Sequence, residues 1–347
     1  MHKVTLGIPI YNAADLIERT ILSALNQTYP NIEYLFIDDK GNSMDVVRRV
    51  VECHPRHEAV RIIDQKYNQG IGAARNAIVE HATGEYLFTM DCDDVIVPDC
   101  IEILYNKMQE HPVDFVAASF VCHDLKGGEY PGCQYAETLV EGGEHPVAEF
   151  RYGRGRELFV ATWNKLYRTE FLRANHIRCL PHHLNEDPWF TYQVVMLARS
   201  CRLIPDVTLY YTYNPDSVSG IAASQGYSER IAMQYEEIER LKSQLVSDYS
   251  SELFYIGALV DIIWMGMYFA YRVLISVQLE AEMKRRLACS LLKRKYAKPE
   301  HYRFNGMLIK YSILHIYWGM PVKVKYTLLK WAASFKLKDK LRRWIHF

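Results

Sequence analysis

Three carboxylates that follow a short apolar run are the residues of this chain best suited to chemistry. The run is Tyr86 to Met90, and Asp91, Asp93 and Asp94 come directly after it. An apolar run of this length, bounded by Gly84 and by charge, predicts a short buried strand. Ligands of open α/β sheets bind at the carboxyl ends of such strands. Because alternate residues of an extended chain share a side, Asp91 and Asp93 can face one cation, and oxygen ligands favour Mg²⁺ or Mn²⁺.

The same carboxylates also allow a purely structural interpretation. Asp93 or Asp94 would be a suitable N-cap for a helix over residues 98–108. The acidic stretch alone does not separate a cation site from a helix cap, so the elements around it have to decide.

The chain before the carboxylates alternates between strand and helix patterns. Strands are predicted over 4–12, 32–39, 60–64 and 86–90, and helices over 13–27, 44–52 (with Ser43 as N-cap) and 73–81. This alternation predicts a largely parallel, Rossmann-like sheet with its site at the strand carboxyl ends. The turn Gly70-Ile71-Gly72 is not a dinucleotide fingerprint, because Arg75 takes the place of the last glycine.

Six separated motifs, in order, resemble those of the family 2 inverting glycosyltransferases of GT-A fold. They are Ile8-Pro9-Ile10-Tyr11-Asn12, Ile37-Asp38-Asp39, Asn68-x-Gly70-x3-Ala74-Arg75-Asn76, Gly84-Glu85-Tyr86 to Asp94, Trp163-Asn164-Lys165-Leu166-Tyr167 and Asn185-Glu186-Asp187-Pro188-Trp189-Phe190. The resemblance implies a mixed, mostly parallel sheet flanked by helices. It covers residues 1–220, the expected catalytic domain, and leaves 221–347 as a mainly helical C-terminal region.

The resemblance also implies roles for individual residues. Donor nucleotide contacts are expected from Pro9, Tyr11, Asn12, Asp38, Asp39, Asn68, Gly70, Arg75, Asp91, Ser217 and Ser219. Asp93 would ligate the cation directly, with Asp91 reaching ribose or a metal-bound water. The bound cation, Mn²⁺ or Mg²⁺, would assist departure of the diphosphate. The loop of Ser217 and Ser219 would close over the diphosphate, or else be an ordinary polar turn.

Inversion requires a carboxylate that removes the proton of the acceptor hydroxyl. By the resemblance Asp187 is the first choice and Glu186 the second; alternatively the pair caps a helix over 189–198. Trp163 and Lys165 belong to the motif on the acceptor side, although a core position explains Trp163 equally well.

One motif departs from the family pattern. The family often reads D-D-G-S-x-D, whereas Asp38-Asp39 is followed here by Lys40-Gly41-Asn42-Ser43-Met44-Asp45. Lys40 would either add positive charge near the base or point to solvent. The departure weakens the assignment of uridine as the nucleoside.

Charge divides the chain into two parts. Residues 1–220 carry 20 Lys/Arg against 30 Asp/Glu, and residues 221–347 carry 21 against 11. A basic tail is expected to meet something anionic. Residues 322–347 intersperse Val324, Leu328, Trp331, Phe335 and Leu341 among lysines, as an interfacial amphipathic helix does, or form a solvated basic face. Nucleic acid is not expected, because no binding motif accompanies the charge.

The apolar run over 253–270 is expected to be a buried helix rather than a membrane span, because Asp261 lies near its middle. The eight scattered cysteines show no metal-ligand spacing and predict reduced thiols. No export signal is expected at the amino terminus.

Together these features predict a metal-dependent inverting glycosyltransferase, cytoplasmic and peripheral on the inner face of the membrane. It would transfer sugar from a nucleotide donor, by expectation UDP-linked, to a hydroxyl of a glycan or lipid-linked acceptor in cell-surface polysaccharide synthesis. The alternatives are a nucleotidyltransferase of sugar metabolism and a non-catalytic glycan- or partner-binding module.

Overall fold

The computed structural model describes residues 1–124, 128–214, 217–293, 296–302 and 306–334. It divides into two compact units. Unit 1 comprises Met1–Val147 and Phe159–Asn214, and unit 2 comprises Ala148–Leu158 and Pro215–Phe347.

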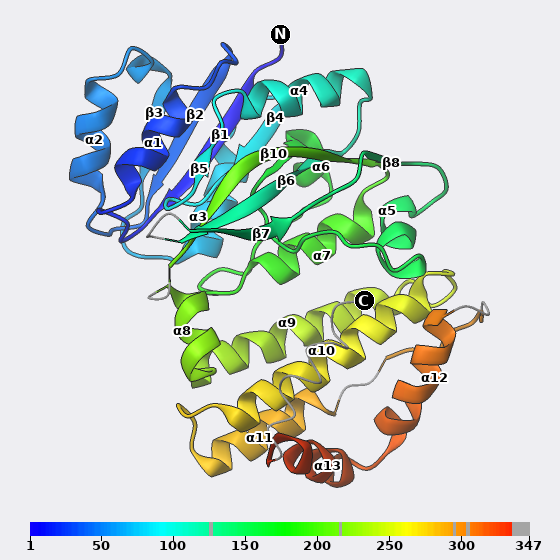
Figure 1. The fold of residues 1–347 in the computed structure, drawn as a ribbon. Helices are drawn as coiled ribbons and strands as arrows, with labels where there is room; N and C mark the ends of the chain where they lie inside the picture. Colours follow the sequence, from blue (N-terminus) through cyan, green and yellow to red (C-terminus); the bar gives the residue numbers. More distant parts are fainter. Residues whose placement is uncertain (125–127, 215–216, 294–295, 303–305, 335–347) are drawn as a thin grey trace. The chain divides into compact units, whose positions relative to one another are not determined.

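The first half of unit 1 contains four parallel strands and the helices that connect them (Figure 1). The strands are β1 (Val4–Ile10), β2 (Ile32–Asp38), β3 (Val60–Asp64) and β4 (Tyr86–Thr89), in the order β3-β2-β1-β4. The connections are α1 (Ile17–Leu25), α2 (Met44–Glu52), the short η1 (His57–Ala59) and α3 (Ile71–His81). The strand–helix alternation predicted from the sequence is confirmed, because runs such as β1 and β4 are buried along their whole length.

The second half of unit 1 extends this sheet with mixed pairing. Its strands are β5 (Val95–Ile96), β6 (Phe115–Asp124), β7 (Glu129–Cys133), β8 (Thr138–Val140), β9 (Lys165–Arg168) and β10 (Cys201–Tyr213). The helices are α4 (Cys100–Glu110), the short α5 (Pro146–Ala148), α6 (Thr169–Ala174) and α7 (Asp187–Leu197). Strand β9 lies antiparallel between β4 and β6, while β10 runs parallel to β6. The predicted fold class, a mixed α/β sheet flanked by helices with a helical region after it, is confirmed.

The structure refines one predicted cap and corrects another. Ser43 is at the N-cap position of α2, as predicted, but its side chain makes no cap bond among the described residues; its Oγ instead accepts a hydrogen bond from the Ala13 amide at 2.8 Å. Helix α4 begins at Cys100 rather than at residue 98, and Asp94 accepts from the Thr212 amide at 2.9 Å. The acidic turn therefore faces strand β10 and does not cap the helix that follows it.

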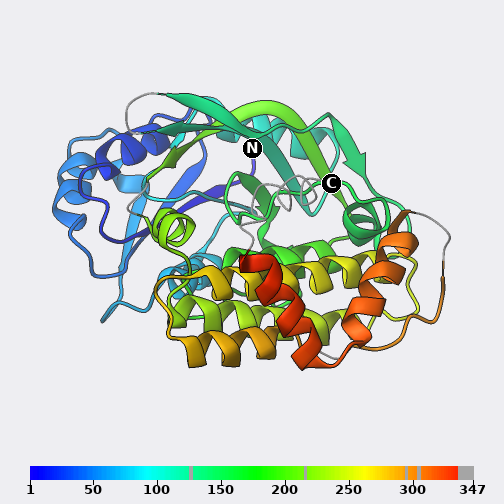
Figure 2. The same cartoon turned by 60° about the horizontal axis from the view of Figure 1, so that its bottom comes forward.

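Unit 2 is helical. It contains a π-helical turn (Glu149–Gly153), α8 (Val218–Gln225), α9 (Glu229–Ser247), α10 (Tyr255–Ile275), α11 (Ala281–Leu291), α12 (Gly306–Gly319) and α13 (Val322–Ser334). Helices α9, α10 and α11 lie side by side (Figures 1 and 2). Residues 335–347, which include part of the predicted interfacial helix, lie outside the described residues.

Helix α10 covers most of the apolar run singled out in the sequence. In the described part of the chain it is the one helix long and apolar enough to cross a membrane, and 50% of its most apolar window is buried in the structure. Gly257 lets α10 approach the Tyr152 carbonyl closely, since an added Cβ would lie 2.0 Å from that oxygen. Asp261 pairs with Arg151 at 3.4 Å.

Candidate active site

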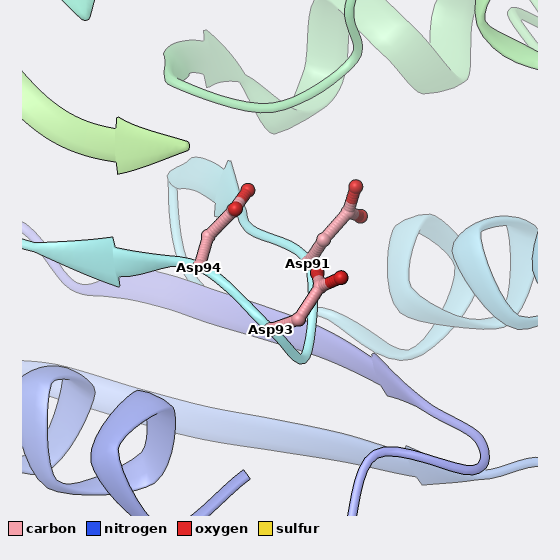
Figure 3. Close-up of side chains that lie close together, drawn as sticks. All are labelled: Asp91, Asp93 and Asp94. Atoms are coloured by element: carbon pink, nitrogen blue, oxygen red, sulfur yellow. The ribbon is translucent and has the colours of Figure 1, made fainter. Parts of the chain in front are cut away.

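The turn between β4 and β5 carries the three carboxylates predicted to form a site. Figure 3 shows Asp91, Asp93 and Asp94 projecting from this one turn. One carboxylate oxygen from each lies within 4.8 Å of the others. Burial and the neighbouring Asp91 charge raise the pKa of Asp93 to about 6. Burial, followed by the charges of Asp93 and Asp91, raises the pKa of Asp94 well above its usual range.

This turn has the properties of a cation site. Oxygen atoms are the ligands that Mg²⁺ and Mn²⁺ prefer, and a cation between crowded carboxylates would remove the repulsion that raises their pKa values. The Oδ2 atom of Asp94 is buried with no hydrogen-bond partner in the described chain. The residues present therefore fit a divalent cation held by Asp91 and Asp93, with Asp94 beside them.

Arg75 connects this turn to the second carboxylate motif. The side chain is 4% exposed, and its Nη2 donates to Asp91 at 2.5 Å. Its Nη1 donates to Asp187 at 2.8 Å and also to Glu186. Three carboxylates thus share one buried guanidinium, and their charge raises its pKa against the opposing effect of burial. Arg75 was expected beside the base or diphosphate; here its Nη groups position the carboxylates.

Asp187 and Glu186 differ in how far they are accessible. The Glu186 side chain is 3% exposed, and burial raises its pKa to about 8 while Arg75 opposes that shift. The Asp187 side chain is 29% exposed, and its Oδ1 accepts from the Thr162 amide at 2.8 Å. A base must reach the acceptor hydroxyl, so this difference favours Asp187 over Glu186.

The two residues also lie at the start of a helix, but their side chains do not cap it as the alternative interpretation supposed. Helix α7 starts at Asp187 with Pro188 in its first turn, and Glu186 precedes it without a side-chain cap bond among the described residues. Proline at this position fits the helix start, since its missing amide is not needed there. The helix start therefore fixes the positions of Glu186 and Asp187, and Arg75 compensates their negative charge.

The residues predicted to bind the nucleoside lie at the ends of β1 and β2. Ile10 and Asp38 are register partners on these parallel strands, so Pro9, Tyr11 and Asp38 end at one edge of the sheet. Tyr11 is 48% exposed, as a side chain that stacks on a base requires. Asn12 has φ 47° and accepts from the Asn42 amide at 3.2 Å, which ties the two loops together.

Lys40 is exposed and also places its charge beside Asp38, so it combines the two predicted positions. Its Nζ pairs with Asp64 and lies 3.7 Å from Asp38, while the Lys40 amide donates to Asp38 at 2.8 Å. The lysine that replaces the glycine of the usual motif is therefore held at the ends of β2 and β3.

Asp39 forms hydrogen bonds with both Asn68 and Gly70. The Asp39 carboxylate accepts from the Gln69 and Gly70 amides at 2.7 and 2.9 Å, and the Asn68 amide group donates to the Asp39 carbonyl at 3.1 Å. Gly70 has φ 87°, a conformation that favours glycine. These residues, predicted to contact the nucleotide, brace the turn that starts α3 and so place Arg75.

The predicted acceptor residues are buried. Trp163 is 5% exposed and stacks on Tyr211 at a centroid distance of 5.5 Å. Lys165 is 2% exposed; its Nζ donates to the Ala161 carbonyl, and burial lowers its pKa to about 8. Both side chains fix the loop whose Thr162 amide holds Asp187, and their acceptor role stays a prediction.

Ser217 and Ser219 belong to the start of α8. Ser217 is its N-cap and accepts from the Gly220 amide at 3.1 Å. The side chain of Ser219 lies outside the described residues. The loop closure predicted for these serines stays a prediction.

Several residues that position the site were not singled out from the sequence. Arg19 donates to the Asp93 carbonyl at 3.0 Å and to Thr212 at 2.7 Å. The Asn76 side chain bonds both backbone groups of Cys179, at 2.8 and 2.9 Å, and so fixes the segment that leads to Glu186. Asn76 is the last residue of the family motif that begins at Asn68, so the motif could have indicated its importance. Arg19 had none, because it acts on residues more than seventy positions away.

Known proteins resemble the chain over the region that contains most of the candidate site residues. The profile of the family described as Glycosyl transferase family 2 matches residues 5–176. The poly(ribitol-phosphate) beta-glucosyltransferase of Bacillus spizizenii is 28% identical over 221 residues, 62% of this chain and 33% of that protein. This chain thus spans about a third of that relative's length.

Two solved structures share the fold over nearly the whole chain. The crystal structure of S. aureus TarS 1-349 in complex with UDP-GlcNAc aligns with a TM-score of 0.58 at 18% identity, covering 97% of this chain and 92% of that one. The mannosyltransferase PcManGT from Pyrobaculum calidifontis, in complex with GDP-Man and Mn²⁺, aligns with a TM-score of 0.54 at 16% identity, covering 96% and 86%.

Proposed function

The chain belongs to glycosyl transferase family 2 and is a glycosyltransferase, and on that premise we propose that it performs a metal-dependent, inverting transfer. The donor is a nucleotide-sugar, preferably UDP-linked, and the acceptor is a hydroxyl of a glycan or lipid-linked glycan of the cell surface. The observation that carries the proposal is the Arg75 guanidinium, which joins Asp91 of the acidic turn to Asp187.

Asp187 acts as the general base. Its partly exposed carboxylate takes the proton of the acceptor hydroxyl as that oxygen forms a bond to the anomeric carbon, and the bond from this carbon to the diphosphate breaks on the opposite face. The Thr162 amide and Arg75 hold one carboxylate oxygen in place, which fixes the direction of the other. A positioned base of this kind contributes a factor of about 10²–10⁴ in rate.

Asp91 and Asp93 hold the divalent cation, and Asp94 stands next to them. When bound, such a cation neutralises charge on the leaving diphosphate. Asp38 and Tyr11, at the ends of β2 and β1, bind the nucleoside. UDP is preferred because a fold relative is in complex with UDP-GlcNAc, and the GDP-Man complex of the other makes guanosine the first rival.

Asp187→Asn tests the proposal, because the substitution keeps the shape of the side chain and removes its basicity. We expect nucleoside diphosphate release from a panel of UDP- and GDP-sugars, with Mn²⁺ and a cell-envelope glycan extract, to fall by about 10²–10⁴. Donor binding should be unchanged. Asp99→Asn is the matched control, since Asp99 is exposed and makes no cap bond to α4 among the described residues. Turnover by Asp187→Asn at the wild-type rate would refute the assignment of the base.

A further inference from the structure

Helix α12 of unit 2 presents an apolar stripe to solvent. Ile309, Ile313 and Ile316 are 53%, 64% and 69% exposed. Their spacing of four and three residues places them on one face of the helix. A helix packed on a core normally turns its polar side outward, so an apolar outer face on α12 is unusual.

Helix α13 repeats the pattern. Val324, Leu328 and Trp331 are 43%, 45% and 62% exposed, again at a spacing of four and three. Lys323 and Lys330 are exposed beside them. Trp331 is a residue type that favours the interface between lipid and water.

Both helices already use their inner faces for packing. Tyr311, Leu314 and Trp318 of α12 and Leu329 of α13 are buried, and both helices pack on α10 (Figures 1 and 2). The outward apolar residues are therefore not needed for the packing of these helices within unit 2. Exposed apolar patches of this kind mark interaction sites.

A buried lysine fixes α13 to α12. The Nζ of Lys325 donates to the Trp318 carbonyl at 3.0 Å and to the Leu292 carbonyl at 2.6 Å. The Tyr317 hydroxyl donates to the Lys325 carbonyl at 3.1 Å. The two stripes are thus carried by a fixed pair of helices, which present them without further folding.

Charge selects the occupant of this surface. Residues 301–334 contain no Asp or Glu, while the exposed Lys310, Lys323 and Lys330 lie within them. A second copy paired through the same face would set lysine against lysine. Apolar residues flanked by lysines with an interfacial tryptophan match a surface that is apolar inside and anionic outside.

We propose that the outward apolar stripes of α12 and α13, together called here the lipid face, bind an anionic lipid membrane. It consists of the apolar residues Ile309, Ile313, Ile316, Val324, Leu328 and Trp331, with Lys323 and Lys330 at its edge. The apolar side chains enter the region of the headgroups, and the lysines contact the phosphates. The inference goes beyond the proposed function and does not depend on it.

Vesicle flotation of the full chain tests the inference, with phosphatidylcholine vesicles prepared with or without phosphatidylglycerol. We expect binding to the anionic vesicles, weakening as salt rises. Lys323→Gln with Lys330→Gln should weaken it by roughly 25-fold, about fivefold for each lysine near an anionic surface. The control, Lys3→Gln with Lys66→Gln, removes the same charge from unit 1 and should bind as the wild type does.

A second variant, Ile313→Ser with Leu328→Ser, tests the apolar part of the face. Both side chains are exposed, so the fold should survive, which circular dichroism would verify. We expect flotation to be lost. The inference would be overturned if the wild type did not float with anionic vesicles. It would also be overturned if both lipid-face variants floated to the same extent as the wild type. A wild-type dimer that the serine variant converts to a monomer would instead assign the face to a second copy.

Discussion

The candidate active site and the lipid face place charge in opposite settings. At the site, Arg75 is 4% exposed and compensates three carboxylates through hydrogen bonds of defined geometry. On the lipid face, Lys323 and Lys330 are exposed beside apolar side chains. A buried ion network is strongly destabilised when one member is removed, because the others stay charged without compensation. Exposed lysines act through long-range attraction, and each contributes a modest, separable amount.

The candidate active site and the lipid face should therefore respond differently to substitution. The site should react to single substitutions with large, non-additive effects, because its members share one guanidinium. The lipid face should respond by small increments that leave the fold intact.

Above pH 8, where Glu186 is ionised as well, Arg75→Ala should destabilise unit 1 by about 3–5 kcal/mol, because it leaves Asp91, Glu186 and Asp187 without their shared cation. Urea unfolding followed by tryptophan fluorescence measures the effect. The matched control is Arg49→Ala, which removes an exposed pair with Glu18 at 3.0 Å and should cost about 1 kcal/mol or less. Equal unfolding midpoints for the two variants would show that the buried network is not what holds this part of the chain.

Glu186→Gln should change how stability depends on pH. The pKa of Glu186 is raised from its usual 4.5 to about 8, first by burial and then by Asp187. The folded state therefore holds the extra proton between these values, and the stability that Glu186 contributes is present below pH 4.5 and is lost as pH rises through 8.

Urea unfolding of both proteins at a series of pH values isolates that contribution. The difference between wild type and Glu186→Gln should fall as pH rises over this interval and then become constant. A difference that stays the same at every pH would mean that Glu186 is ionised throughout.

Lys323→Gln should have the smallest effect on stability. The side chain is exposed, so the free energy of unfolding should change by no more than about 0.5 kcal/mol. The same urea unfolding experiment provides the measurement. A loss of several kcal/mol would show that the lipid face is part of the packed structure of unit 2, and the contrast with the site would disappear.

The sequence predicted the parts of the site that depend on local pattern. A short apolar run ending in carboxylates gave both β4 and the acidic turn, and the helix over 44–52 was predicted with the bounds of α2. These predictions succeeded because strand burial and helical periodicity are visible within a few residues. Glu186 and Asp187, the two carboxylates predicted as candidates for the general base, also lie at the site, next to Arg75.

What the sequence could not give were interactions between distant segments. Strand β9 enters the sheet antiparallel between β4 and β6, which brings the Thr162 amide to Asp187. No periodicity reports that placement. Likewise, the Asp39 carboxylate accepts from two backbone amides, and the side chain of Ser43, at the N-cap position of α2, bonds to Ala13 instead of to the helix; neither partner is visible in the local sequence. A polar residue type indicates that a partner is needed, while the three-dimensional arrangement decides which one.

Calorimetric titration of UDP, with and without Mn²⁺, into the wild type and Asp93→Ala tests the central claim most directly. The claim is that the carboxylates after β4 hold the cation that binds the donor diphosphate. It predicts UDP binding that requires Mn²⁺ in the wild type and in the control Asp99→Ala, and that is lost in Asp93→Ala. Mn²⁺-dependent binding of UDP to Asp93→Ala with wild-type affinity would contradict the claim.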